Sequence, residues 1–386
     1  MVISTRSAIS PRKEVLLVGL GPVGAIYAFL AHSSRLARVT VVARSNFDIV
    51  CEHGLEFQSR KFGQHSGWKR DRLCKSVSEA ADTQYDYVLV ATKCVPEVVT
   101  TPEMLAPLLS VPYVNTFTQP TYVLLQNGLS IENDLYGSLI ALGQGPPRIV
   151  SAAVFVFANI TGKNVIEHDD MERLVMGVYR HKNFTTVVNS REEQKLLDDL
   201  GSIFAEGGST VEIVPEIQRR KYHKNMYNAV FASACILTRN PLTAFFRPPP
   251  SDPTKPYEPF VFPATADLIN EHAIKGCEKT FEELLRLARA LGFPDSEEGI
   301  PTEVITNAVP QHRQMFSTPW SFHKPSTLVD CEKGVPMEIE VIWGSVVRLA
   351  REHGVPVPRL EILYSLLLVI QNQLLRVKNA GRCVVN

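Results

Sequence analysis

One lysine in the second half of the chain stands where a polar side chain could do chemistry. Lys224 begins a helix-like stretch, and Asn228, four residues later, shares its helix face. A lysine enclosed in a cleft loses part of its preference for the charged form, so it can serve as a proton donor.

Polar residues also stand at predicted strand ends, turns and helix starts, where they could face a ligand. The four groups are Lys93, Gln126 to Gly128, Lys224 to Asn228, and Ser326 to Asp330 followed by Glu338. Each also has a structural explanation: a solvated strand end, a turn, a basic exposed run, or a first-turn acid that complements a helix dipole. Only their combination would make a site.

A glycine loop near the start of the chain predicts a dinucleotide site. Val15 to Val18 reads as a buried strand, and Ala25 to Ala31 reads as the first turns of a helix. The loop between them consists of Gly19, Leu20, Gly21, Pro22, Val23 and Gly24. In this motif the first glycine permits a tight turn, the second admits the pyrophosphate, and the third lets the helix approach the strand. The helix N-terminus then faces the phosphate charge.

The end of the second strand favours NADP(H) over NAD. An NAD site usually places an acid about twenty residues after the glycines, to bind the ribose hydroxyls. Here Arg44 and Ser45 stand at that place, and the next acid is Asp48. A guanidinium suits a 2′-phosphate because it forms bidentate, charge-assisted hydrogen bonds.

Strands separated by helix-length spacers predict a parallel sheet with helices on both faces. After the first strand, the expected strands are 39–43, 87–91, 122–125 and 150–157. Ligands of such sheets lie beyond the carboxyl ends of the strands. Arg44, Lys93 and Asn127 stand there, so we expect them to meet the glycine loop.

The second half of the chain is predicted to be helical, over 222–237, 265–291, 338–353 and 359–378. We therefore expect an α/β fold, with a Rossmann-type doubly wound domain at 14–214 and an all-α substrate and catalytic domain at 215–386. A Pro-rich stretch at 246–263 predicts an exposed insertion loop, and residues 1–13 predict a flexible leader.

The composition excludes several classes of protein. Of the 386 residues, 45% are hydrophobic and the net charge is 0, which indicates a globular chain without a nucleic-acid or acidic-membrane surface. The seven cysteines form no C-x-x-C pair, so we expect reduced thiols, no metal site and a cytoplasmic location. The short leader, with three basic residues and no acid, leaves a mitochondrial presequence open.

The chain resembles the ketopantoate reductase (2-dehydropantoate 2-reductase) family. The resemblance rests on the glycine loop, Ala91-Thr92-Lys93, Gln126-Asn127-Gly128, Lys224 to Ala229, Asn240 to Ala244, Ser326 to Asp330 with Glu338 to Glu340, and Gly354 to Pro358. It implies a 6-phosphogluconate dehydrogenase-like C-terminal domain and the NADPH-dependent reduction of 2-dehydropantoate to (R)-pantoate in pantothenate biosynthesis. The substrate would be a small molecule, and a homodimer stays open.

The resemblance also implies roles for single residues. Lys224 would be the catalytic proton donor, and Glu338 the acid that works with it. Asn127, Asn228 and Ser326 would hold the substrate. The cofactor would lie against the six loop residues, Arg44, Lys93 and Asn127.

Three positions depart from the family pattern and put the substrate in doubt. Ala232 replaces a second asparagine, so one substrate contact is either missing or supplied by Ser233 or another residue. Tyr222 replaces a tryptophan, and Asn225 takes a position that is usually apolar. The alternatives are a related reductase of another 2-oxo acid and a non-catalytic NADP-binding regulatory protein.

Overall fold

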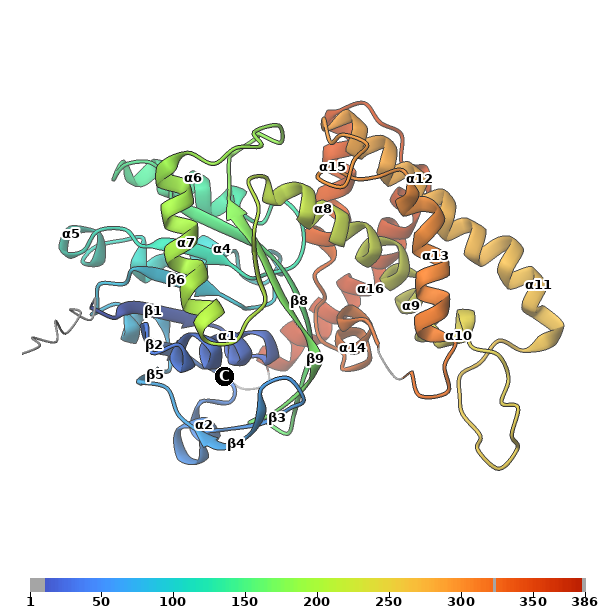
Figure 1. Ribbon diagram of the computed structural model, residues 1–386, viewed down its shortest axis with the longest axis horizontal. Coiled ribbons are helices and arrows are strands. Elements are labelled where there is room, and N and C mark those ends of the chain that lie inside the picture. Colours follow the sequence, from blue (N-terminus) through green and yellow to red (C-terminus); the bar gives the residue numbers. More distant parts are fainter. Residues whose placement is uncertain (1–10, 322–323, 384–386) are drawn as a thin grey trace, which may run out of the picture.

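The computed structural model describes residues 11–321 and 324–383 (Figure 1). Its strands are β1 Lys13–Val18, β2 Ala37–Val42, β3 Leu55–Ser59, β4 Gly63–Trp68, β5 Arg72–Cys74, β6 Tyr87–Val90, β7 Thr121–Leu124, β8 Ile149–Thr161, β9 Val165–Val178 and β10 Val211–Ile213. They form one sheet in the order β4-β3-β9-β8-β7-β6-β1-β2-β5, with β10 beside β9. Strands β5, β2, β1, β6, β7 and β8 run parallel to one another. The five predicted strands are thus confirmed, with ends that shift by a few residues.

Helices cover both faces of this sheet because its central strands are apolar on both sides. The helices of this half are α1 Pro22–Ser33, α2 Phe47–His53, α3 Val77–Ala80, α4 Thr101–Met104, η1 Ala106–Leu108, α5 Tyr113–Thr116, α6 Asn133–Leu142 and α7 Arg191–Glu206. Leu17 of β1 packs in the cluster that contains α1 and α7, whereas its neighbour Leu16 packs in the cluster that contains α6. Successive side chains of a strand point to opposite faces, so β1 is buried from both.

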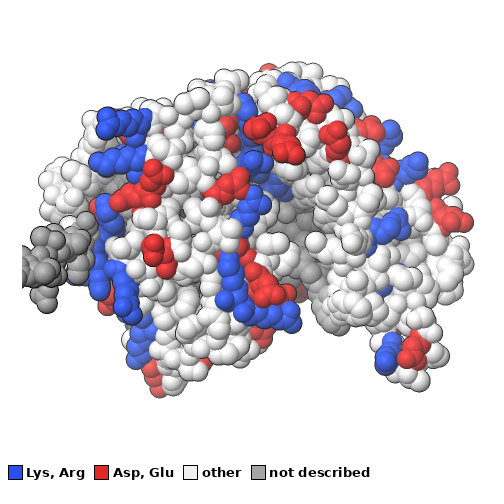
Figure 2. Space-filling model, viewed as in Figure 1, with Lys and Arg blue, Asp and Glu red and all other residues white. Residues whose placement is uncertain are grey.

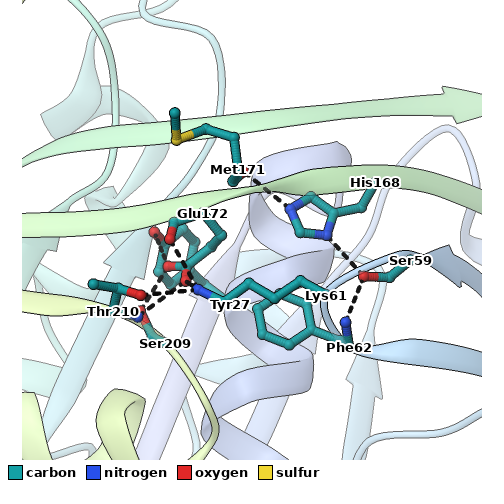
Figure 3. Close-up of polar contacts among 9 residues, drawn as sticks. All are labelled: Tyr27, Ser59, Lys61, Phe62, His168, Met171, Glu172, Ser209 and Thr210. Atoms are coloured by element: carbon teal, nitrogen blue, oxygen red, sulfur yellow. Dashed lines mark hydrogen bonds and ion pairs between the residues drawn. The ribbon is translucent and has the colours of Figure 1, made fainter.

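Strands β8 and β9 extend the sheet as a long antiparallel pair. The carboxylate of Glu172 on β9 gathers four partners (Figure 3): it accepts from Tyr27 of α1 at 3.0 Å, Ser209 at 2.6 Å, Lys61 at 2.8 Å and the Thr210 amide at 3.1 Å. The side chain of Glu172 is fully buried. A buried carboxylate with this many donors ties α1, and with it the glycine loop, to the sheet.

A second contact fixes the turn between β3 and β4 against β9. The ring of His168 bonds to the Ser59 hydroxyl at 2.8 Å and stacks on Phe62, with 5.2 Å between ring centroids (Figure 3). Burial lowers the pKa of His168, so the neutral ring is favoured. The β3–β4 hairpin is thereby held beside the cleft described below.

From Ile217 to Cys383 the described elements are all helical. They are α8 Ile217–Tyr227, η2 Asn228–Ala232, α9 Ser233–Thr238, α10 Thr243–Phe246, η3 Pro263–Thr265, α11 Ala266–Leu268, η4 Ile269–Ile274, α12 Lys275–Ala290, α13 Glu303–Phe316, α14 Ser326–Glu332, η5 Glu340–Gly344, α15 Ser345–Glu352 and α16 Pro358–Cys383. The fold class predicted from the sequence is therefore confirmed. We propose the domain boundary at 214/215, between β10 and α8.

Three of the long helical stretches contain a π-helical segment, namely η2, η4 and η5. Segment η2 continues α8, and η5 directly follows Glu338 and Ile339. Such segments are common at functional sites because they re-aim side chains that a regular helix would point elsewhere.

The Pro-rich stretch projects from the helical half as a loop between α10 and η3 (Figure 1). The backbone closes it where the Val261 amide donates to the Arg247 carbonyl at 2.8 Å. Arg247 itself is buried and its guanidinium donates to the Ser321 carbonyl. The prediction of an exposed loop is confirmed for most of it and wrong for its buried start, Phe246 and Arg247.

The described part of the chain has a strand, β1, near its start and a long helix, α16, at its end. Strand β1 begins at Lys13, inside the predicted leader, and residues 1–10 lie outside the described residues. Helix α16 is the one described helix that is long and apolar enough to cross a membrane, since an 18-residue window within 358–380 has a mean hydropathy of 1.3. Of that window 17% is buried, including Leu360, Leu367 and Gln371, and length and composition alone are weak evidence for a membrane span.

Both signs of charge lie side by side over the face seen in Figure 2. This mixture agrees with the net charge of 0.

Candidate active site

The two halves of the chain enclose one cleft of about 1700 Å³. Of the residues predicted for a site, those that line it are Gly19, Leu20, Gly21, Pro22, Val23, Arg44, Lys93, Asn127, Lys224, Asn228, Ser326 and Glu338. Only Gly24 does not line it. Residues from the whole length of the described chain thus meet at the carboxyl ends of the parallel strands, as such sheets require.

The glycine loop has the geometry that a pyrophosphate site needs. Gly19 has φ +104°, and a Cβ on it would lie 2.7 Å from the Cγ2 of Thr92. A Cβ on Gly24 would collide with the Gly19 carbonyl, so α1 can pack this closely only on glycine. At Gly21, by contrast, a Cβ would meet nothing within 4 Å and would project into open space beside the cleft. The loop therefore has room for a ligand where the motif expects one.

Two neighbours complete the nucleotide end of the cleft. The side-chain amide of Asn46, which is buried, donates to the Leu20 carbonyl at 3.0 Å and so fixes the glycine loop. Arg44 is exposed at the end of β2, and Lys75 lines the cleft just after β5. Two cations near a ribose position would suit a phosphate there.

Lys224 projects from α8 toward the sheet half. Its Nζ donates to the Oδ1 of Asn127 at 2.9 Å and to the Val154 carbonyl, and it lies 5.3 Å from the centre of the Phe155 ring. Burial lowers the pKa of Lys224 to about 8; the charge of Glu338 raises it in part, and Lys221 lowers it further. A lysine ammonium has three N–H groups. With two of them engaged, one remains for a ligand in the cleft.

Glu338 is almost fully buried and is held from several sides. Its Oε1 accepts from the Cys94 amide at 3.0 Å, and its Oε2 accepts from the Nδ2 of Asn127 at 3.4 Å and lies 3.7 Å from the Nζ of Lys93. Asn127 therefore bridges the two residues predicted to be catalytic, with its oxygen toward Lys224 and its nitrogen toward Glu338. These contacts leave Asn127 only one possible orientation of its amide.

Lys93 links both carboxylates of the helical half to the sheet. Its Nζ lies 2.6 Å from the Oδ2 of Asp330 as well as 3.7 Å from Glu338. Burial would lower the pKa of Lys93, but the charges of Glu338 and Asp330 outweigh it and raise that pKa. Lys93 therefore stays charged and partly neutralises the two carboxylates.

Two sets of buried contacts hold the backbone next to Lys224 and Glu338. Lys221, one turn before Lys224, pairs with Glu132 of the sheet half and donates to the Ser151 hydroxyl at 2.9 Å. Gln371 of α16 bonds both backbone groups of Met337, the residue before Glu338, each at 2.9 Å. A fully bonded buried side chain of this kind restricts the backbone beside it.

The positions that depart from the family pattern have distinct surroundings. Ala232 lines the cleft, whereas Ser233 is fully buried and donates to the Val230 carbonyl at 2.8 Å. The expectation that Ser233 could replace the missing amide is therefore wrong. Asn225 donates to the Ile342 carbonyl at 2.8 Å, and the Tyr222 hydroxyl donates to the Leu284 carbonyl at 2.8 Å. Both of these residues join helices to each other and do not line the cleft.

Several residues of the cleft were not predicted from the sequence. Asn46 and Lys75 give no signal of their own, because a lone asparagine or lysine in a loop is common. Phe231 could have been found, since it follows Lys224 by seven residues on the same helix face. His312 and Phe316 come from α13 and reach the cleft only through helix packing.

The cleft brings the glycine loop together with Lys224, a lysine whose pKa is lowered to about 8. A proton could pass from Lys224 to an oxygen atom placed beside it, and a bound nicotinamide could supply a hydride to the carbon of the same group. Among the described residues, no group of three or more His, Cys, Asp or Glu is placed to hold a metal ion.

Comparison with known proteins agrees with this geometry. Two models of the ketopantoate reductase PanE/ApbA family match, one over residues 15–181 and its C-terminal part over residues 262–371. A 2-dehydropantoate 2-reductase of Nostoc sp. is 21% identical over 91% of this chain and 93% of its own length, and an uncharacterized protein of Saccharomyces cerevisiae is 26% identical over 94% of each.

Solved structures share the fold over nearly the whole chain. The 2-dehydropantoate 2-reductase of Methylococcus capsulatus has a TM-score of 0.70 at 23% identity, covering 94% of this chain and 97% of its own. D-mandelate dehydrogenase with NADH and anilino(oxo)acetate has a TM-score of 0.68 at 16% identity, covering 94% and 99%. With the family models matching in both halves, the chain belongs to the ketopantoate reductase (PanE/ApbA) family of oxidoreductases.

Proposed function

We propose that this chain catalyses the NADPH-dependent reduction of a 2-oxo acid to the corresponding 2-hydroxy acid. The observation that carries the proposal is the placement of Lys224. It faces the same cleft as the glycine loop, its pKa is lowered to about 8, and one of its N–H groups has no partner among the described residues.

In the proposed reaction the substrate carbonyl would lie beside Lys224. Bound NADPH would supply a hydride to the carbonyl carbon and be oxidised to NADP⁺. Lys224 would give its proton to the carbonyl oxygen as negative charge develops there, and the neutral amine would regain a proton from water. The carbonyl thus gains one C–H and one O–H bond.

The other residues would prepare Lys224 and the substrate for this step. Asn127 would hold the lysine in place, and the charge of Glu338, which raises the pKa of Lys224, would keep enough of it protonated at neutral pH. Asn228 and Ser326, which line the cleft on the helical side, would bind the polar groups of the acid.

The cofactor would lie along the glycine loop, with Lys93 and Asn127 at its nicotinamide end. The open space beside Gly21 and the exposed guanidinium of Arg44 fit a dinucleotide with a 2′-phosphate, which supports NADPH. The D-mandelate dehydrogenase structure holds NADH, so the choice between the two cofactors needs a direct measurement.

Two substrate classes have support. Family membership and the Nostoc relative favour 2-dehydropantoate, reduced to (R)-pantoate for pantothenate biosynthesis. Ala232 favours another 2-oxo acid, because no side-chain amide stands there and Ser233 faces away. The cytoplasmic location stays a prediction, and a homodimer is supported only by the dimeric ketopantoate reductase of Staphylococcus aureus, which has the same fold.

The test is the turnover of a panel of 2-oxo acids by the full chain with NADPH and with NADH. We expect at least one acid to be reduced, and reduced faster with NADPH than with NADH. Tight binding of NADPH without turnover of any acid would contradict the proposal and favour the non-catalytic alternative.

A further inference from the structure

We propose that the preferred substrate is a 2-oxo acid whose side chain is a large apolar group, an aromatic ring above all, and carries no hydroxyl. This inference rests on the proposed function, because it takes the substrate carbonyl to lie beside Lys224. It concerns the part of the same cleft that would receive the remainder of the substrate.

Four rings form a stack along the helical side of the cleft, which we call the aromatic wall. It consists of Tyr227, Phe231, His312 and Phe316, all of which line the cleft. The His312 ring stacks against three others, with ring centroids 5.3 Å apart for Tyr227, 4.1 Å for Phe231 and 5.9 Å for Phe316, and with interplanar angles of 15°, 29° and 27°. Because the rings support one another, the wall is already assembled without a ligand.

The wall begins directly beyond the proposed proton donor. Tyr227 follows Lys224 by three residues within α8, roughly 5 Å along the axis, and Phe231 lies in the π-helical segment η2 that continues α8; both line the cleft. A substrate whose carbonyl meets Lys224 and whose side chain points along this helix would lie against the rings. Leu242 and Ile342 line the same cleft and add further apolar surface.

Past Asn228, this helix offers the cleft no group that could bind a substrate hydroxyl. The side chains it presents there are those of Phe231 and Ala232. The hydroxyl of Ser233 is bonded to the Val230 carbonyl within the helix, and Asn225 is bonded to the Ile342 carbonyl. The Nδ1 of His312 is likewise bonded to the Ala308 carbonyl at 2.9 Å.

These surroundings discriminate between substrates in a definite direction. A substrate hydroxyl that loses water without gaining a partner weakens binding roughly 5- to 150-fold. An aromatic ring placed on the wall instead gains buried apolar area and ring contacts. The small side chain of Ala232 leaves room for such a ring where a larger polar residue would fill the space.

The test compares 2-dehydropantoate with phenylpyruvate as substrates of the full wild-type chain, using NADPH. We expect kcat/KM to be at least roughly tenfold higher for phenylpyruvate, in the range that pocket complementarity supplies. The variant Ala232→Asn should then raise kcat/KM for 2-dehydropantoate and lower it for phenylpyruvate. Ala234→Asn, on the same helix but outside the cleft lining, is the matched control and should leave the ratio unchanged.

The outcomes separate this inference from the proposed function. A wild-type preference for 2-dehydropantoate overturns the inference and leaves the proposed reduction intact. The absence of turnover with every 2-oxo acid of the panel overturns both. The wild-type comparison needs no variant, so it decides the matter even if Ala232→Asn fails to fold.

Discussion

The Nζ of Lys224 lies 2.9 Å from the side-chain oxygen of Asn127, a residue of the other half of the chain. The nitrogen of the same amide donates to Glu338. One asparagine thus aligns a lysine of α8 with a carboxylate that stands just before the helical residues Ile339 and η5. The hydrogen bond to Asn127 fixes the position of Lys224, and the charge of Glu338 raises the pKa that burial lowers.

The pH dependence of the reaction should follow the ionisation of Lys224. Reduction needs the protonated amine, and the pKa of Lys224 is about 8. We therefore expect kcat/KM for reduction to be level below pH 8 and to fall tenfold per unit above it, whereas oxidation of the hydroxy acid should rise toward that pH. In Glu338→Gln the break should move to lower pH, because the carboxylate that raises the pKa of Lys224 is lost. A reduction rate that stays level well above pH 8 would contradict the role of Lys224.

Arg44 should distinguish NADPH from NADH. Its guanidinium is exposed at the end of β2 and lines the cleft. Loss of a charge-assisted contact to a phosphate costs about 1.5–3 kcal/mol, so Arg44→Ala should weaken NADPH binding roughly 10- to 100-fold and leave NADH binding nearly unchanged. Fluorescence titration measures both affinities.

The control for Arg44→Ala is Arg38→Ala, which removes another exposed arginine of β2. Arg38 pairs with Glu14 and does not line the cleft, so this variant should bind NADPH normally. Equal losses of NADPH and NADH affinity in Arg44→Ala would show that Arg44 does not contact the 2′-phosphate.

The close approach of α1 to β1 should tolerate no side chain at Gly24. Its Cβ would collide with the Gly19 carbonyl, so Gly24→Ala should lower the free energy of unfolding by about 1–3 kcal/mol or more and weaken NADPH binding. Gly137→Ala in α6 is the control. A Cβ there meets nothing within 4 Å, and the change should be neutral or stabilise the helix by up to about 1 kcal/mol. Urea unfolding measures the free energy of unfolding of both variants. A similar loss of stability in the two variants, or no loss in either, would contradict this account of the loop.

Local sequence patterns predicted the strands and helices whose residue types match their burial in the structure. The central strands are short apolar runs, and the glycine spacing between β1 and α1 has a single structural use. Strand β9 was missed because its middle carries Glu167, His168, Asp169, Asp170, Glu172 and Arg173, which read as a loop. The partner strands β8 and β3 hold it in the sheet, and no window of the sequence contains that information.

The sequence suggested which residues could belong to the candidate site, but it did not predict the distances between them. Lys93 and Asp330 are 237 positions apart, yet their charged atoms lie 2.6 Å apart. The aromatic wall depends on packing between α8 and α13, so a stack such as Phe231 on His312 could not be read from either segment alone. Ser233 illustrates the opposite error. It is next to Ala232 in the sequence, yet its hydroxyl donates to the Val230 carbonyl of its own helix and it does not line the cleft.

The most direct test of the central claim is the activity of Lys224→Ala together with its affinity for NADPH. Removal of a general acid should lower kcat for 2-oxo acid reduction roughly 10²- to 10⁴-fold, while NADPH binding stays near normal. Lys279→Ala, which removes an exposed lysine of α12 paired with Glu282, should retain full activity. A Lys224→Ala enzyme that reduces its 2-oxo acid at a near-normal rate would contradict the claim that Lys224 donates the proton.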